Sequence, residues 1–478
     1  MRARSVVLGT LLIATSAGSA AAHAAAGSVD LRVIEAVRQR DGKALAALLK
    51  GKGVDVNTRQ PDGATALHWA ANLDDVPAAE QLLRAGADAD AANDYDVTPL
   101  MLAAENGSAK MVAALLKGGA QPNKALPSGE TVLMIAARTG GAAAVDALAG
   151  RGADVNAAEK AKGQTPLMWA VSEQHLDVAR TLIARGAHVN AAARSGFTAL
   201  MFAARTGDIE TARLLLKHGA DVNAAAADGT AAILIAAVRG NVPMAEFLLE
   251  NGANPNTDAA GYSALHWASG LWEGVTSHDY HVEDGEWSAL RGVPRQKEQL
   301  IKALLAHGAN PNTRMTKQAP RYGYNLFQER NVVSVTPFFL AALSGDIATM
   351  RLLVAGGANP QIRSGDGTTA LMAAAGSAWV ENESLVPEDD RIAAAKLCLD
   401  LGIDVNATNN AGAMALHSTI QGEFNRVIQF LADNGANPNI RDKAGYTPLR
   451  RAEDPAAASR IRVRAETAAL LRKLGGTL

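Results

Sequence analysis

The sequence has a single cysteine, few aromatic residues and no excess of either charge sign. Because Cys398 is the only cysteine, the chain contains no internal disulfide. Aromatic residues make up 4% of the composition, which predicts a core of Leu, Ile, Val and Ala. The formal net charge of −2 lacks the basic excess of a duplex-binding protein. We therefore expect no nucleic-acid partner.

Long apolar runs are also scarce, and the one that stands out lies near the start. Arg2 and Arg4 precede an apolar run over residues 6–17, and small-x-small triplets follow at 22–24 and 24–26. This order is typical of a secretory signal peptide, predicted here as residues 1–26. An uncleaved anchor is the alternative, although the run is short for a bilayer span. We expect no membrane span after cleavage, and a periplasmic or secreted chain of bacterial origin.

Motifs of catalysis are missing as well. The sequence contains no Gly-x-Ser-x-Gly, no His-Glu-x-x-His and no P-loop. One acidic stretch holds possible first-row metal ligands at loose spacing, namely His278, His281, Glu283 and Asp284. We therefore predict no enzyme activity, no cofactor and no metal, and keep a metal-dependent protein with its site in residues 271–290 as an alternative.

What the sequence has instead is a glycine that returns about every 33 residues. It stands at residues 53, 86, 119, 152, 186, 219 and 252, then after wider gaps at 308, 357, 402 and 435. A fixed period of this length predicts a stacked array of small units, each of which buries its apolar face against its neighbours.

One unit, residues 198–223, shows what each repeat encodes. Thr198 is placed to cap a first helix by accepting hydrogen bonds through its hydroxyl. From Ile209 onward, apolar residues at i, i+3, i+6 and i+7 form one face of a second helix. Gly219 then ends that helix in the left-handed conformation. Cys398 occupies the apolar register of Leu215, which predicts a buried thiol, with a reactive thiol as the alternative.

Two recurring phrases give the array a family resemblance. Residues 65–70 (TALHWA), 98–103 (TPLMLA) and 165–170 (TPLMWA) resemble the Thr-Pro-Leu-His-x-Ala of ankyrin repeats, and Gly-Ala-Asp-Val-Asn completes the match. The resemblance implies an all-α ankyrin-repeat solenoid of about twelve helix-turn-helix units joined by finger loops. It spans residues 27–478 as a single domain, with an N-terminal cap at 29–57 and a C-terminal capping unit at 445–478.

The chain departs from this family pattern at the histidine. Met replaces it at residues 101, 134, 168, 201 and 372, whereas His68, His266 and His417 keep it. The family's histidine hydrogen-bonds the finger loop, so we expect the loops of the Met units to be held less firmly.

The regular spacing breaks between Gly252 and Gly402. The distances from Gly252 to Gly308, Gly357 and Gly402 grow in steps of 56, 49 and 45 residues. Counting from the cap positions places insertions at about 271–296 and 376–390, between the two helices of a unit, and at about 314–331, in a finger loop. The first and third are acidic.

These insertions also concentrate the chain's aromatic residues. Trp, Tyr and Arg are the usual anchors of protein interfaces, and loops on a rigid scaffold commonly carry binding. We predict a protein-binding patch within residues 271–391, formed by Trp272, Tyr280, Trp287, Arg321, Tyr322, Tyr324, Phe327 and Trp379. The alternative is that the insertions fold onto the solenoid and bury these side chains as packing.

The resemblance implies protein–protein interaction as the function. We predict a non-catalytic scaffold that uses the ankyrin groove and the inserted loops to hold a protein partner in the cell envelope. An accessory or inhibitory subunit of an exported enzyme is the second interpretation. Capped ends favour a monomer.

Overall fold

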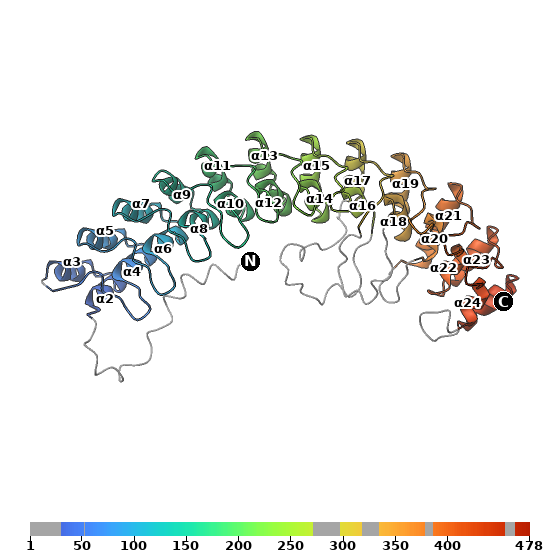
Figure 1. Ribbon diagram of the computed structural model, residues 1–478, viewed down its shortest axis with the longest axis horizontal. Coiled ribbons are helices and arrows are strands. Elements are labelled where there is room, and N and C mark those ends of the chain that lie inside the picture. Colours follow the sequence, from blue (N-terminus) through green and yellow to red (C-terminus); the bar gives the residue numbers. More distant parts are fainter. Residues whose placement is uncertain (1–29, 52, 271–296, 318–333, 378–385, 455–463) are drawn as a thin grey trace. The chain divides into compact units, whose positions relative to one another are not determined.

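The computed structural model describes residues 30–51, 53–270, 297–317, 334–377, 386–454 and 464–478. These residues form 24 helices in twelve pairs, and their only β-structure is three isolated bridges, which confirms the predicted all-helical solenoid (Figure 1). In chain order the pairs are α2 (Arg32–Arg38) and α3 (Gly42–Lys50), α4 (Ala66–Asn72) and α5 (Val76–Arg84), α6 (Pro99–Glu105) and α7 (Ala109–Lys117), α8 (Val132–Thr139) and α9 (Ala142–Ala149), α10 (Pro166–Ser172) and α11 (Leu176–Ala184), α12 (Ala199–Thr206) and α13 (Ile209–Lys217), α14 (Ala232–Val238) and α15 (Val242–Glu250), α16 (Ala264–Ser269) and α17 (Lys297–Ala306), α18 (Pro337–Leu343) and α19 (Ile347–Ala355), α20 (Ala370–Ala375) and α21 (Glu388–Asp400), α22 (Ala415–Thr419) and α23 (Asn425–Asp433), and α24 (Pro448–Glu453) and α25 (Ala465–Lys473).

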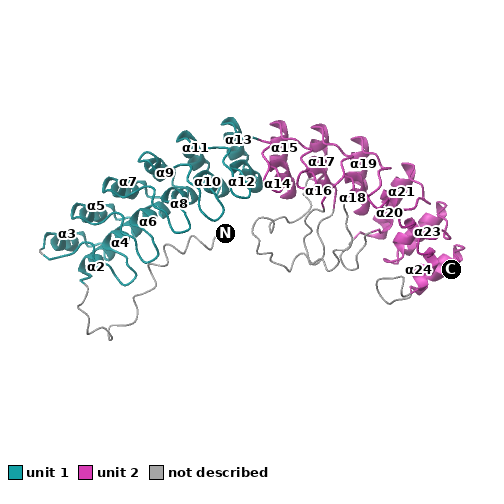
Figure 2. Ribbon diagram, viewed as in Figure 1, with its two compact units in different colours: residues 1–221 teal, residues 222–478 magenta. Residues whose placement is uncertain are grey.

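The chain falls into two compact units, residues 1–221 (unit 1) and residues 222–478 (unit 2) (Figure 2). Within each unit the even-numbered helices form an inner layer and the odd-numbered helices an outer layer, and finger loops extend beside the inner layer (Figure 1). Alanines such as Ala70 and leucines such as Leu82 are fully buried between the layers. The single domain expected over residues 27–478 stays a prediction.

Hydroxyl side chains set the start of most inner helices. Thr98 lies in extended backbone, and its hydroxyl accepts a hydrogen bond from the Met101 N–H. The same role was expected of Thr198 and is wrong, because its buried hydroxyl has no partner among the described residues. There the Met201 N–H donates to the main-chain carbonyl of Thr198, at 3.1 Å.

The recurring glycine ends each outer helix through its backbone conformation. Gly219 has a φ of +85°, which confirms the predicted left-handed turn. A Cβ added there would meet no atom within 4 Å. The requirement for glycine therefore comes from the dihedral angle and not from crowding.

An asparagine side chain clamps each repeat to the next. Asn190 Nδ2 donates to the Gly219 carbonyl at 2.8 Å, and its Oδ1 accepts from the Asp221 N–H at 2.8 Å. The same two bonds recur at Asn57, Asn123, Asn156, Asn223, Asn256, Asn312, Asn406 and Asn439. This ladder satisfies backbone groups at every turn and fixes the spacing of neighbouring finger loops.

The described residues also bracket the insertions. Residues 271–296 lie between α16 and α17, within one helix pair. The loop between α17 and α18 is still ordered at Met315, whose N–H donates to the Val335 carbonyl at 3.0 Å. The third stretch, expected at 376–390, ends earlier than expected, because α21 already begins at Glu388.

Candidate protein interface

The residues predicted to form the binding patch lie outside the part of the chain that the structure describes. They are Trp272, Tyr280, Trp287, Arg321, Tyr322, Tyr324, Phe327 and Trp379. The metal-ligand candidates His278, His281, Glu283 and Asp284 and the signal peptide at residues 1–26 also fall outside it. These predictions, and the packing alternative, stay predictions. The described array contains a different candidate surface.

That surface is a strip along the inner helices of unit 1, formed by the fourth and seventh residues after each N-cap. These two positions are three residues apart and therefore share a helix face. On this strip, arginines stack on aromatic rings. The guanidinium carbon lies 4.8 Å from the ring centre in Arg38–Trp69, 5.9 Å in Arg138–Trp169 and 4.9 Å in Arg205–Phe202. We call these residues, with Asn72, Glu105 and Ser172, the inner strip of unit 1.

A charged cluster lies within the strip. Arg138 Nη2 lies 2.9 Å from Glu105 Oε2 on the neighbouring inner helix and 3.6 Å from Glu130 Oε1 on the preceding finger loop. Burial raises the pKa of Glu105 and of Glu130, and the attraction of Arg138 opposes that shift in both. The sequence analysis missed this cluster, although Glu105 and Arg138 carry opposite charges at one register, 33 residues apart.

The same two positions become apolar or small in the irregular repeats of unit 2. Val238, Gly270, Leu343 and Gly376 occupy the seventh position. Val238, Trp267 and Leu340 belong to a buried cluster that also contains Leu234, Tyr262, Met315, Val335, Phe339 and Ala373. Because Val238 and Trp267 are almost fully buried, this face is part of the packed interior.

The three conserved-pattern histidines hold finger loops. Nδ1 of His68 faces the Thr65 N–H, and Nε2 lies 3.0 Å from the Val97 carbonyl of the next finger loop. His266 and His417 make the same two contacts. Burial lowers the pKa of each to about 4, so the folded chain holds them neutral at pH 7. At the Met positions this ring contact is absent.

Chemistry-bearing groups elsewhere in the described chain are few. Cys398 is fully buried, and burial raises the pKa of its thiol to about 12, which confirms a buried thiol. Among the described residues, no three His, Cys, Asp or Glu side chains gather into a group that would hold a metal. None of the described helices has the length and apolar character needed to cross a membrane.

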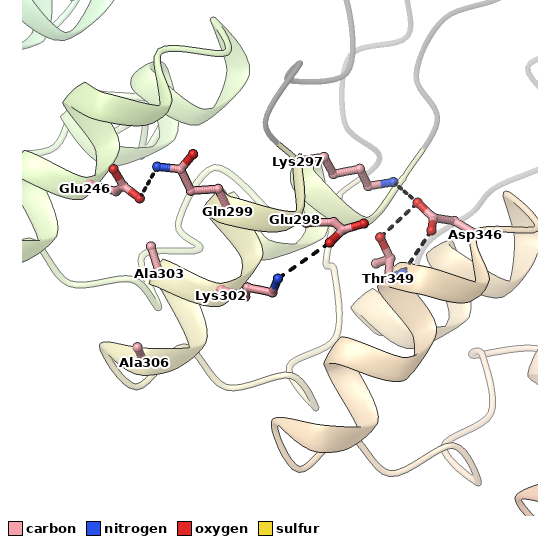
Figure 3. Close-up of a pocket in the computed structure, with 9 residues that line it drawn as sticks. All are labelled: Glu246, Lys297, Glu298, Gln299, Lys302, Ala303, Ala306, Asp346 and Thr349. Atoms are coloured by element: carbon pink, nitrogen blue, oxygen red, sulfur yellow. Dashed lines mark hydrogen bonds and ion pairs between the residues drawn. The ribbon is translucent and has the colours of Figure 1, made fainter.

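A groove of about 850 Å³ lies along the outer helices α15, α17 and α19 of unit 2 (Figure 3). Its lining residues are Glu246, Lys297, Glu298, Gln299, Lys302, Ala303, Ala306, Asp346 and Thr349. They bond to one another, with Lys297 Nζ at 2.7 Å from Asp346 Oδ2 and Gln299 Nε2 at 2.7 Å from Glu246 Oε1. The groove thus satisfies its own polar groups.

The acidic start of α21 is engaged by the next repeat. Glu388 Oε2 accepts from the Arg426 N–H at 2.9 Å and from the Val427 N–H at 3.3 Å, and Asp389 pairs with the Arg426 side chain. Arg391, by contrast, is 2% exposed and stacks on Phe424, at 4.3 Å. Within the described chain it has no ion pair, and burial lowers its pKa to about 10.

A family model described as "Ankyrin repeats (3 copies)" matches residues 33–125, 133–226 and 200–276. Ankyrin repeat and SOCS box protein 16 of Mus musculus is 31% identical over 115 residues, which are 24% of this chain and 24% of that protein. Putative ankyrin repeat protein L86 of Acanthamoeba polyphaga mimivirus is 32% identical over 112 residues, 22% of this chain and 19% of that protein.

The matched stretches thus span a quarter or less of the length of these curated relatives. Among solved structures, the crystal structure of the human ASB11 ankyrin repeat domain is 28% identical to this chain, with a TM-score of 0.42. That match covers 47% of this chain and 98% of the solved one.

Proposed function

This chain is an ankyrin-repeat protein, and from that premise we propose that it is a non-catalytic scaffold that binds a protein partner. Ankyrin repeats generally mediate protein–protein interaction. The observation that supports the proposal in this chain is the inner strip of unit 1, where Arg38, Arg138 and Arg205 stack on aromatic rings. Arginine and tryptophan dominate the energetics of protein interfaces.

The strip suits binding because it is already ordered. Hydrogen bonds from the asparagine ladder fix each finger loop to its neighbour, and the His68 ring ties one inner helix to the next loop. A partner that docks on such a surface avoids most of the entropy loss of ordering a loop. Rigid repeats thereby convert contact area into affinity.

We propose further that the insertions add contacts through Trp272, Tyr280, Trp287, Arg321, Tyr322, Tyr324, Phe327 and Trp379. Their residue types support this role. We also propose that the chain acts in the cell envelope as a periplasmic or secreted monomer, after removal of residues 1–26. The apolar run behind Arg2 and Arg4 supports export.

Affinity capture from the native envelope fraction tests the proposal. The baits are the intact chain, a strip variant Ser172→Arg, and a matched control Ala143→Arg on the exposed surface of outer helix α9. We expect a partner that is held by the intact chain and by the control but lost by Ser172→Arg. Equal recovery with all three baits would contradict binding at the strip.

A fourth bait separates the insertions from the strip. In it residues 271–296 and 318–331 are cut back to short turns, while Met315 is kept because it is buried in the unit 2 cluster. Loss of the partner from this bait alone would assign recognition to the insertions. Retention would assign it to the array.

A further inference from the structure

Three buried polar atoms without a hydrogen-bond partner gather at one point of the inner strip of unit 1. In the stretch from residue 53 to residue 270, which is fully described, Trp169 Nε1, Arg138 Nε and Glu130 Oε1 all lack such a partner. Buried polar atoms are normally hydrogen-bonded, and each unpaired one is a standing demand for a donor or an acceptor. Two of these atoms are donors and one is an acceptor.

The charges at this point do not balance either. Glu105 and Glu130 contribute two carboxylates and Arg138 one guanidinium, which leaves one negative charge in excess. Their side chains are 13% and 20% exposed, so solvent screens the excess poorly. The Glu130 charge helps to raise the pKa of Glu105. A further cation would relieve both carboxylates.

The distances show which carboxylate is available. Arg138 binds Glu105 at 2.9 Å, a full hydrogen bond, whereas the 3.6 Å to Glu130 Oε1 is too long for one. Glu130 Oε1 is therefore the open acceptor. Trp169 is half-buried, and its ring lies beside the open acceptor, on the far side of Arg138, where it offers a cation a second attractive surface.

We propose that Glu130, Arg138, Trp169 and Glu105 form a subsite for a lysine or arginine of an extended segment in the protein partner. The cationic side chain donates to Glu130 Oε1, and a main-chain carbonyl of the same segment accepts from the Trp169 N–H. This inference rests on the proposed function and names the chemistry of the partner at the strip. The other pair with a printed acid, Arg38 with Glu35, is balanced one to one and lacks this excess.

Selection from a random peptide library tests the subsite. Short peptides displayed on phage are panned on the immobilised full chain, and the enriched peptides are synthesised and titrated by calorimetry. We expect enriched peptides to carry a Lys or Arg. Glu130→Gln should weaken their binding about tenfold and Trp169→Phe, which keeps a ring but removes the N–H, by a few-fold. The control Glu173→Gln, an exposed acid at the end of α10, should leave binding unchanged.

A change on the peptide side avoids any folding defect in the protein. Replacing the peptide's lysine with norleucine should cost intact protein the same factor as Glu130→Gln, and the two changes together should cost little more. Equal affinity for the intact chain and Glu130→Gln, enrichment of acidic peptides, or no enrichment would overturn the subsite. If Ser172→Arg still abolishes binding while Glu130→Gln does not, the proposed function survives and the subsite alone fails.

Discussion

Unit 1 and unit 2 each contain six helix pairs, yet they use the same inner face in opposite ways. In unit 1 the seventh position after the N-cap is polar, as at Asn72, Glu105 and Arg138, and these side chains are partly exposed. In the irregular repeats of unit 2 it is apolar or small, as at Val238 and Leu343. The repeats that carry the insertions are thus the ones whose inner face has become interior.

The outer helices differ between the units as well. Eleven residues before the recurring glycine, unit 1 has Asp75, Ser108 and Asp208, whose side chains cap the helix. In unit 2 Asp346 caps in this way, but Lys297, Arg391, Phe424 and Arg464 occupy the same register in other repeats. A cation at a helix start is unfavourable. The regular unit is therefore stabilised locally, and the irregular one by contacts between repeats.

Acid should separate the two units most strongly. Unit 1 has one buried neutral histidine, His68, and unit 2 has two, His266 and His417, each with its pKa lowered from 6.5 to about 4. Between those values the unfolded chain binds protons that the folded chain does not, so stability is present above pH 6.5 and is lost as pH falls. Each histidine should lose about 3 kcal/mol by pH 4, hence about 6 kcal/mol in unit 2.

Hydrogen exchange resolved by peptide checks this difference, with labelling of the buried Cys398 as a second report on unit 2. His266→Met and His417→Met, which copy the residue used in five other repeats, are the control and should remove the excess acid sensitivity of unit 2. Equal acid loss in the two units would break the comparison.

A reciprocal exchange tests the inner face directly. Val238→Asn places an amide in a fully buried position and removes apolar burial, so we expect a loss of about 3 kcal/mol in the free energy of unfolding. Asn72→Val, at the equivalent exposed position of unit 1, should change it by less than about 0.5 kcal/mol. Urea denaturation measures both. Similar losses would mean that the two faces are not different in kind.

The sequence predicted the helix pairs because each repeat carries its own local signals. The period, the cap at Thr98 and the turn at Gly219 act within a few residues, and they recur. The charged cluster of Glu105, Glu130 and Arg138 depends on stacking instead. Opposite charges one period apart were the available signal, but their burial and their unpaired atoms follow only from the packed structure.

Cross-repeat contacts explain the other departures from prediction. The acids at the start of α21 looked unopposed, because Arg426, which pairs with Asp389, lies 37 residues later in the chain. The failed cap at Thr198 has another cause. Its residue type is right, and the outcome depends on whether the N–H of residue 201 turns to the hydroxyl or to the carbonyl.

The outer-helix register predicts substitutions of opposite sign in the two units. Arg391→Met removes a buried guanidinium that has no ion pair within the described chain, so we expect stabilisation by about 2 kcal/mol. Asp208→Met in unit 1 removes the bond from the Thr211 N–H and should destabilise by about 1 kcal/mol. Thermal unfolding of both variants measures the difference. A loss of stability in Arg391→Met would show that the guanidinium is satisfied.

The smallest effect tests whether regularity in sequence means regularity in bonding. Thr336 in the irregular unit 2 accepts a hydrogen bond from the Phe339 N–H at 3.3 Å, whereas the buried hydroxyl of Thr198 in the regular unit 1 lacks a partner among the described residues. Thr→Val keeps the shape and removes the hydroxyl. We expect Thr336→Val to lose about 1 kcal/mol and Thr198→Val to be neutral or slightly stabilising, as measured by urea midpoints. If Thr198→Val loses as much as Thr336→Val, its hydroxyl is bonded in solution, and the cap of unit 1 is intact. The predicted order instead places a working cap in the irregular unit and an idle one in the regular unit, because the bond depends on the local backbone geometry of each repeat.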